Sequence, residues 1–316
     1  MKDSFGREIT YLRLSVTELC SFRCRYCMPE CGVEKKRHED MLTEDEMISA
    51  VKACASLGVT KLRITGGEPL VKKNILSICE RSVKVGGIRT LGITTNGIKL
   101  PELAMPLKNC GVSRVNISLD TLKADRFSYI TRRGNLRDTL AGIDSALHAG
   151  FEKVKINTVL IGGFNDDEIR DLASLTQKIP VDVRFIELMP MVDGEFKKSA
   201  FISADAVTDA LPELEKIPDD GGVARLYKLP GSYGNVGLIS PVSSHFCASC
   251  NRLRITADGK IRPCLHSPLE YSIKGLDENK MTEMISLAIQ AKPFKHGELT
   301  YGNMSKAERN MNQIGG

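Results

Sequence analysis

The 316-residue sequence lacks several features that would place it in a membrane, secretory or nucleic-acid-binding class. No run of residues approaches the roughly 18–20 consecutive apolar residues that a membrane-spanning helix needs. The N-terminus, Met1-Lys2-Asp3-Ser4, does not have the pattern of a signal peptide. There is no Trp and no low-complexity segment, and the net charge of +5 is spread along the chain. We therefore expect a globular cytoplasmic protein that binds neither a membrane nor nucleic acid.

A Walker phosphate-binding motif, Gly-x4-Gly-Lys-Ser/Thr, is also missing, so phosphate binding by a P-loop is not supported. The modest positive charge would suit an anionic small molecule if several cations converged in one pocket. The composition, 42% hydrophobic and 26% charged, is that of a globular protein, and 316 residues are enough for one large domain or two medium ones with a substantial core.

What the sequence does have is ten cysteines, which in a cytoplasmic chain indicate metal ligands or reduced thiols rather than disulfides. Cys20, Cys24 and Cys27 are spaced C-x3-C-x2-C. Because iron–sulfur sites use one Cys per iron, three thiolates leave one iron of a four-iron cluster open to a reactive ligand. The spacing therefore favours catalysis over electron storage. A structural zinc site and a closed, ferredoxin-like site completed by Cys31 are the alternatives.

A second set of three cysteines lies near the C-terminus. Cys247 and Cys250 form C-x2-C, and Cys264 follows. Judged from the residues alone, a zinc knuckle is the better interpretation, with His245 or His266 as the fourth ligand.

Two arginines lie between these cysteines on a strand-like run. Arg252 and Arg254 point to the same face because they are two residues apart. Their planar guanidinium groups suit phosphate oxygens, although two solvated surface charges are the common alternative. The remaining cysteines, Cys54, Cys79 and Cys110, fall in helix-like stretches and are expected to be small core residues.

Strand-like and helix-like stretches alternate over the first 190 residues. Six strands so placed imply a parallel sheet with helical crossovers, which falls short of the eight units of a closed barrel. A doubly wound open sheet is the competing topology. The strands are predicted at 11–16, 62–65, 90–95, 113–118, 153–161 and 181–187, and the helices at 43–57, 72–84, 101–110, 136–149 and 166–178.

Candidate site segments follow the first three predicted strands. They are the first cysteine set, the turn 66–69 (Gly-Gly-Glu-Pro) and the turn 94–97 (Thr-Thr-Asn-Gly). Ligands bind at the carboxyl ends of parallel strands in both competing topologies, so we expect these segments to form one site. The alternation stops near residue 190. Short strands are predicted near 224–228, 236–240, 252–256 and 260–263, with a helix at 277–291, which indicates a smaller C-terminal region.

These residues resemble a known family. The first cysteine set, with Tyr26 before its last member, resembles the motif of the radical S-adenosylmethionine enzymes, and turn 66–69 resembles their methionine-binding turn. The whole chain is similar to the GTP 3′,8-cyclase family of molybdenum cofactor biosynthesis. The second cysteine set, its arginines and the terminal Gly315-Gly316 make the match specific. Other similar segments are 12–17, 63–69, 94–97, 116–120 and 184–189.

The resemblance implies a partial (β/α)6 TIM-like barrel over residues 1–190. A smaller C-terminal α+β region, residues 191–316, would carry a second iron–sulfur cluster. It implies that a 5′-deoxyadenosyl radical takes the C3′ hydrogen of GTP and that C3′ then attacks guanine C8. The product would be (8S)-3′,8-cyclo-7,8-dihydroguanosine 5′-triphosphate. The cofactors implied are two [4Fe-4S] clusters and S-adenosylmethionine, which overturns the zinc interpretation of the second set.

The resemblance also implies residue roles. Cys20, Cys24 and Cys27 would hold the first cluster, and Cys247, Cys250 and Cys264 the second. S-adenosylmethionine would contact Tyr26, Gly67, Ser118 and Met189. GTP would contact Arg13, Arg63, Thr94, Lys155, Arg184, Arg252 and Arg254. Arg13, Gly315 and Gly316 would be catalytic, the last two as a tail in a site where only a backbone without side chains fits.

The partners implied are GTP as substrate, a flavodoxin- or ferredoxin-like electron donor, the next pathway enzyme (cyclic pyranopterin monophosphate synthase) and a second copy of the chain. Two other classes of function compete. A different two-cluster radical enzyme, acting on a peptide or metabolite, would not need the triphosphate-binding cations. A non-catalytic iron–sulfur or zinc protein would carry electrons or bind a partner.

Overall fold

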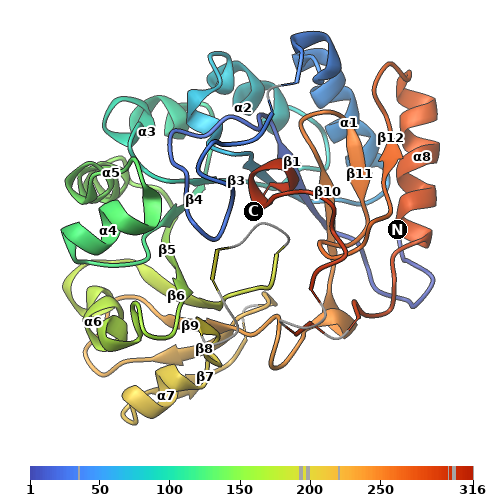
Figure 1. The fold of residues 1–316 in the computed structure, drawn as a ribbon. Coiled ribbons are helices and arrows are strands. Elements are labelled where there is room, and N and C mark those ends of the chain that lie inside the picture. Colours follow the sequence, from blue (N-terminus) through green and yellow to red (C-terminus); the bar gives the residue numbers. More distant parts are fainter. Residues whose placement is uncertain are drawn as a thin grey trace.

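The structure is a computed structural model that describes residues 1–34, 36–191, 195–196, 200–219, 221–297, 299–300 and 304–315. The strands of these residues form one 12-stranded sheet in the order β12-β11-β10-β1-β2-β3-β4-β5-β6-β9-β8-β7. Its middle consists of six parallel strands in chain order (Figure 1). They are β1 (Tyr11–Ser15), β2 (Lys61–Thr65), β3 (Thr90–Thr95), β4 (Arg114–Ser118), β5 (Lys153–Leu160) and β6 (Asp182–Glu187).

Helices connect these strands and lie outside the curved sheet (Figure 1). They are α1 (Glu44–Ser56), α2 (Ile75–Val83), α3 (Leu100–Asn109), α4 (Ala124–Thr131), α5 (Leu136–His148) and α6 (Ile169–Lys178). The capping box predicted before α1 is present, with the Thr43 side chain accepting from the Glu46 amide. Helix α4 was not predicted. It is 8 residues long and begins without a side-chain cap, so its sequence carries a weak start signal.

The strand order decides between the two predicted topologies. A doubly wound sheet reverses direction at a switch point, whereas β1 to β6 follow one another around the curve without a reversal. The partial six-unit barrel is therefore confirmed, and the doubly wound alternative is wrong.

The C-terminal strands extend the same sheet at both edges. Strand β9 pairs in parallel with β6, and β10 pairs in parallel with β1. The strands are β7 (Glu215–Ile217), β8 (Arg225–Lys228), β9 (Val236–Ile239), β10 (Arg252–Ile255), β11 (Lys260–Arg262) and β12 (Tyr271–Ser272); the helices are α7 (Ala206–Ala210), α8 (Glu278–Gln290) and α9 (Met311–Ile314). The short elements α7, β7, β12 and α9 were not predicted, and the division at residue 190 stays a prediction.

The two faces of the sheet differ in chemistry. Alternate strand residues such as Leu12, Ile64 and Ile156 are fully buried and belong to the core between the sheet and the outer helices. Their neighbours, such as Arg13, Arg63 and Lys155, line a cavity inside the curve. The apolar core therefore lies outside the barrel, and its interior is left for polar groups. Among the described helices, none combines the length and the apolar character that crossing a membrane requires.

Candidate active site

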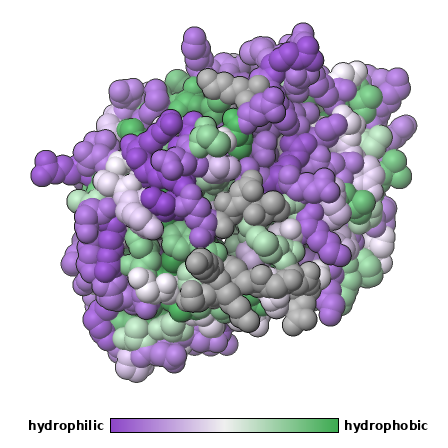
Figure 2. All heavy atoms as spheres, in the orientation of Figure 1, coloured by the Kyte–Doolittle hydropathy of each residue, from purple (hydrophilic) through white to green (hydrophobic). Residues whose placement is uncertain are grey.

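One cavity of about 410 Å³ contains nearly all the predicted site residues. It lies inside the curve of the sheet, and mostly polar and charged side chains cover the face of the molecule around it (Figure 2). Both cysteine sets line it, although more than 200 residues separate them in the chain. The other lining residues among those predicted are Arg13, Tyr26, Arg63, Gly67, Thr94, Ser118, Lys155, Arg184, Met189, Arg252 and Arg254.

Strand register brings the arginines together. Arg13 of β1 lies opposite Arg254 of β10 on one side and Arg63 of β2 on the other. The next position in this row is Gly92 of β3, where an added Cβ would lie 2.7 Å from the Arg63 guanidinium. A glycine in β3 therefore leaves the space in which the Arg63 side chain lies.

The grouped cations perturb one another. Burial, followed by Arg252 and Arg63, lowers the pKa of Arg13 to about 10. Burial, followed by Arg13 and Arg252, also lowers the pKa of Arg254 well below its usual value. Binding an anion here would relieve this repulsion, which favours a negatively charged ligand.

Tyr11 lies among these arginines and was missed by the sequence analysis. Its hydroxyl accepts a hydrogen bond from Arg63 Nε at 3.0 Å. Burial raises the pKa of Tyr11, but Arg63, Arg13 and Arg252 together lower it to about 7. Tyr11 lies two residues before Arg13 on the same face of β1, so strand periodicity could have identified it.

The sequence analysis also missed Asn116 and Asn157, which share a property with Thr94, a predicted GTP contact. Among the residues that the structure describes, the buried atoms Thr94 Oγ1, Asn116 Oδ1 and Asn157 Oδ1 have no hydrogen-bond partner, and all three residues line the cavity. Buried polar atoms are normally paired, so these three favour a ligand that supplies the partner. Asn157 lies two residues after Lys155 on β5, again on the cavity side. Lys155 itself forms an ion pair with Asp182 at 3.3 Å.

The first cysteine set fits an iron–sulfur cluster. Burial raises the pKa of Cys20 to about 11 and that of Cys27 to about 12. Burial, followed by the neighbouring Cys27, raises the pKa of Cys24 well above its usual value. These three partly buried thiols would become thiolates when a metal centre binds them. With one sulfur per iron, this donor set suits a four-iron cluster with one iron free of protein thiolate.

The turn after β2 packs directly on the loop that carries these cysteines. The Gly67 amide donates to Thr17 O at 2.7 Å, and the Glu68 amide donates to Leu19 O at 2.8 Å. A Cβ on Gly66 would lie 2.6 Å from Thr17 O, and one on Gly67 would lie 2.4 Å from Leu19 O. Contact with the cysteine loop is therefore a structural reason for glycine at both positions.

Glu68 connects this turn to the turn after β3. Its carboxylate accepts from Thr95 Oγ1 at 2.7 Å, from the Asn96 amide at 2.6 Å and from the Leu70 amide at 2.9 Å. Burial raises the pKa of Glu68 to about 7. The three segments that follow β1, β2 and β3 are thus bonded into one unit, which confirms the predicted convergence of these loops.

The residues expected at S-adenosylmethionine besides Gly67 follow or end strands β1, β4 and β6. The Tyr26 hydroxyl donates to Asp120 Oδ2 at 2.8 Å. Asp120 follows β4, accepts from the Val159 amide at 2.8 Å and is almost fully buried. Sequence analysis did not single out Asp120, although it ends segment 116–120. Ser118 at the end of β4 and Met189 after β6 line the same cavity.

The second cysteine set surrounds the ammonium group of a buried lysine. Lys292 Nζ donates to Arg252 O at 2.8 Å and to Pro263 O at 2.6 Å. Burial raises the pKa of Cys250, but Lys292 and Arg252 lower it below its usual value overall. His245 and His266, proposed as zinc ligands, also line the cavity. Within the described residues, no group of three or more Cys, His, Asp and Glu side chains is arranged to hold a metal ion.

The C-terminal tail reaches the arginines. Gly315 O accepts from Arg254 Nη1 at 2.7 Å and from Arg13 Nε at 3.3 Å. Gly315 has a φ of +78°, and an added Cβ would lie 2.4 Å from Thr65 Oγ1. Only glycine fits both conditions. Gly316, predicted to be catalytic, lies outside the described residues.

The other cysteines lie away from the cavity lining. Cys31 is exposed and is not among the lining residues, so the structure does not support it as a fourth ligand of the first set. Cys54 and Cys79 are buried in the core as predicted, and Cys110 is partly buried against it.

Comparison with known proteins agrees with this geometry. A family model described as Radical SAM superfamily matches residues 14–176, and one described as Molybdenum Cofactor Synthesis C matches residues 181–298. The GTP 3′,8-cyclase of Alkaliphilus oremlandii (strain OhILAs) is 46% identical, with 100% of each chain covered. That of Moorella thermoacetica (strain ATCC 39073 / JCM 9320) is 44% identical, again with 100% of each chain covered.

Solved structures share the fold at low sequence identity. Streptococcus suis SuiB bound to S-adenosylmethionine superposes with a TM-score of 0.59 at 15% identity, covering 91% of this chain and 65% of that chain. The structure of anSMEcpe with bound AdoMet gives 0.60 at 15% identity, covering 97% and 89%. The chain therefore belongs to the radical SAM superfamily and, within it, to the family of the GTP 3′,8-cyclases.

Proposed function

We propose that the protein converts GTP into (8S)-3′,8-cyclo-7,8-dihydroguanosine 5′-triphosphate, the first step of molybdenum cofactor biosynthesis. The observation that carries the proposal is one cavity lined by both cysteine sets and by all the cations expected for a triphosphate. The curated relatives named above, which are GTP 3′,8-cyclases over their whole length, support it.

Radical SAM enzymes use S-adenosylmethionine with a [4Fe-4S] cluster, and together these supply the radical that removes a hydrogen atom from the substrate. Cys20, Cys24 and Cys27 would hold this cluster. Tyr26, Gly67, Ser118 and Met189 would contact S-adenosylmethionine. Asp120 would orient Tyr26 through the hydrogen bond to its hydroxyl.

We assign a second [4Fe-4S] cluster to Cys247, Cys250 and Cys264. The ammonium group of Lys292 supports this assignment because a buried positive charge is stabilised by thiolates next to it. Both sets line the same cavity, so a substrate held in it would contact both regions.

The chain's own cations would bind the triphosphate. Arg13, Arg63, Arg252 and Arg254 stand together, and their mutual repulsion falls when phosphate oxygens are bound. Lys155 is paired with Asp182, so it would add less net charge than the arginines. Gly315 would hold Arg13 and Arg254 in position through its carbonyl, and Thr94, Asn116 and Asn157 offer unpaired polar atoms to the nucleoside.

The remaining expectations extend this proposal. Residues 1–190 would form the radical-generating region and 191–316 the substrate-side region. The enzyme would act in the cytoplasm and receive electrons from a flavodoxin- or ferredoxin-like donor. Its product would pass to cyclic pyranopterin monophosphate synthase, and a second copy of the chain is a further proposed partner.

Anaerobic reconstitution followed by incubation with S-adenosylmethionine, reductant and GTP tests the proposal. We expect methionine, 5′-deoxyadenosine and the cyclised nucleotide in equal amounts, and none of them from a Cys24→Ala variant. Iron and sulfide analysis of the same samples separates an enzyme from a zinc protein. Intact clusters with 5′-deoxyadenosine formed equally with and without GTP, and no cyclised nucleotide, would refute the assignment of GTP as substrate.

A further inference from the structure

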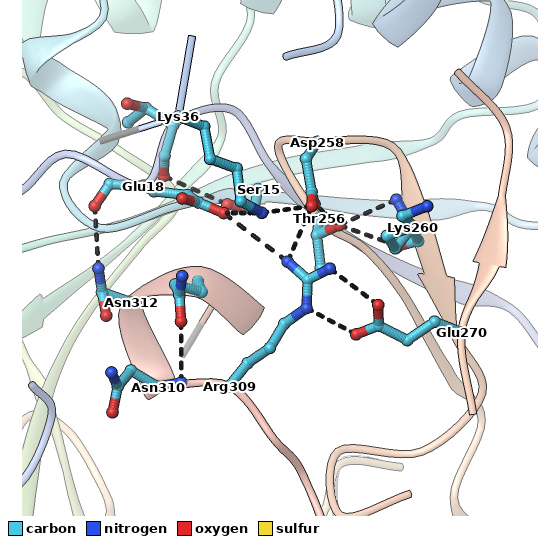
Figure 3. Close-up of polar contacts among 12 residues, drawn as sticks. Ser15, Glu18, Lys36, Thr256, Asp258, Lys260, Glu270, Arg309, Asn310 and Asn312 are labelled. Carbon is cyan, nitrogen blue, oxygen red and sulfur yellow. Dashed lines mark hydrogen bonds and ion pairs between the residues drawn. The ribbon is translucent and has the colours of Figure 1, made fainter. Parts of the chain in front are cut away.

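The C-terminal segment, residues 304–315, is held by ion pairs that the proposed chemistry does not use. Arg309 makes a two-point ion pair with Glu270, with Nε 2.7 Å from Oε1 and Nη2 2.8 Å from Oε2. Its Nη1 lies 2.9 Å from Asp258 Oδ2 (Figure 3). Glu270 lies just before β12, and Asp258 lies in the turn between β10 and β11. One arginine thus fixes the segment to two parts of the C-terminal region.

Further ion pairs connect Arg309 and Asp258 to the loop that leads into the first cysteine set. Glu18, two residues before Cys20, has its Oε1 3.8 Å from Arg309 Nη1. Lys36 completes the group, with its Nζ 3.2 Å from Glu18 and 2.5 Å from Asp258. We call Glu18, Lys36, Asp258, Glu270 and Arg309 the tail ion network (Figure 3).

Burial makes this network stronger than ordinary surface pairs. The side chains of Glu18, Asp258 and Arg309 are 6%, 8% and 14% exposed. A bidentate guanidinium–carboxylate pair with little water around it is among the stronger polar contacts in proteins. Removing Arg309 would leave buried carboxylates without their main partner, which is unfavourable.

Beyond Arg309, the segment contacts both the loop of the first cysteine set and the arginines of the cavity. The Asn312 side chain donates to Glu18 O at 3.0 Å, and the Asn312 backbone amide is close enough to the Cys27 sulfur to oppose the rise in the pKa of that thiol. Three residues further on, Gly315 O receives Arg254 and Arg13. Helix α9, which contains Asn312, has only 4 residues, too few to be stable on its own. Its position must therefore come from tertiary contacts, which include the packing of Ile314 against Met191 and Ala307.

We propose that Arg309 is a positioning residue. Its ion pairs hold the C-terminal segment so that Asn312 reaches Cys27 and Gly315 reaches Arg13 and Arg254. A single charged group thereby sets the distance between the first cysteine set and the cations across the cavity. This inference rests on the proposed function only for its turnover measurement, because the geometry is independent of the substrate.

Hydrogen exchange of the full-length reconstituted protein tests the positioning directly. In Arg309→Gln, the backbone amides of residues 310–315 should exchange about tenfold faster or more, the effect of losing charge-assisted hydrogen bonds. Arg309→Lys keeps the charge but loses the two-point geometry, so its exchange rates should lie between those of the parent protein and those of Arg309→Gln. The matched control is Arg170→Gln, which breaks an exposed ion pair with Glu213 far from the segment and should change nothing there. Unchanged exchange at 310–315 in Arg309→Gln would overturn the proposal.

A second measurement separates positioning from general stability. The Asn312 amide lies beside Cys27, a proposed cluster ligand, so its displacement in Arg309→Gln should shift the midpoint potential of the first cluster to a lower value. Iron content should stay near that of Arg309→Lys, although the lost ion pairs lower the midpoint of thermal unfolding. An unchanged potential together with lower iron content would assign Arg309 a merely structural role.

Turnover completes the test through a double-mutant cycle. If Arg309 acts in part through Gly315, Arg309→Gln should lower kcat by a larger factor in the full chain than in a chain ending at Ile314, which keeps Asn312 but lacks Gly315. Additive losses would overturn the proposal. Absence of cyclised GTP from every variant, with the exchange and potential changes still present, would refute the proposed function and leave the positioning role standing.

Discussion

Replacing Gly67 with alanine tests whether the turn after β2 is shaped by contact with the cysteine loop. The new Cβ would lie 2.4 Å from Leu19 O and 2.7 Å from Glu18 O, both backbone atoms that cannot rotate away. An ordinary contact needs about 1 Å more, so the turn and the loop must separate. Two hydrogen bonds join them, from the Gly67 and Glu68 amides.

The expected cost follows from these contacts. Overpacking costs about 1–3 kcal/mol, and weakening two hydrogen bonds adds about 1 kcal/mol, for a total of about 2–4 kcal/mol. An unfolding entropy of about 2.1 cal/mol/K per residue over 316 residues converts this to a fall in Tm of about 3–6 °C. Because Cys20 follows the displaced loop directly, we also expect less iron after reconstitution.

Calorimetry and iron analysis of the purified variant measure both effects. Gly86→Ala is the matched control, since a Cβ there meets nothing within 4 Å and its φ is ordinary. We expect the control to keep the Tm and iron content of the parent protein. A Gly67→Ala protein with unchanged Tm and full iron content would refute the argument from packing.

Three further predictions concern single side chains. Cys31→Ala should keep both clusters and full activity because Cys31 is exposed outside the cavity, and loss of iron from this variant would instead indicate a closed four-cysteine site. Tyr11 should titrate near pH 7, so tyrosinate absorbance at 295 nm should rise there in the parent protein and not in Tyr11→Phe; equal curves for the two would contradict the effect of the arginines. The pKa of Glu68 is raised from 4.5 to about 7 in the folded protein, so the folded protein binds this proton more tightly than the unfolded chain does. The resulting stabilisation is present below pH 4.5 and is lost as the pH rises to 7. The loss should be about 3 kcal/mol in denaturant unfolding and absent in Glu68→Gln, and the same pH dependence in both proteins would exclude Glu68 as its source.

The main strands and helices could be predicted from the sequence because each of these elements carries a local signal. Apolar and polar residues alternate in β1 to β6, and α1 begins with a capping box that is present in the structure. Short elements without such signals, α4 with no side-chain cap and β12 with 2 residues, were missed. They form because their neighbours hold them, which no local window can reveal.

Several site residues were missed for a related reason. Tyr11 and Asn157 belong to no motif, and Asn116 was noted only as the first residue of segment 116–120. Each lines the cavity because strand register places it on the cavity side of the sheet. Period-two alternation from Arg13, Ser118 and Lys155 would have selected them. Lys155 was selected correctly for the cavity, but its pairing with Asp182 of the neighbouring strand depends on register alone.

The sequence by itself determined the chemistry available to this protein. The spacing of Cys20, Cys24 and Cys27 decides how many irons can receive a thiolate, and that number depends only on local chain geometry. The tertiary structure decided which other residues share a cavity with the first cysteine set. It placed both cysteine sets in the lining of one cavity, left Cys31 outside that lining and brought Gly315 of the tail to Arg13 and Arg254. These are contacts between residues far apart in the chain, and only the closure of β10 and β9 onto the edges of the barrel brings them together.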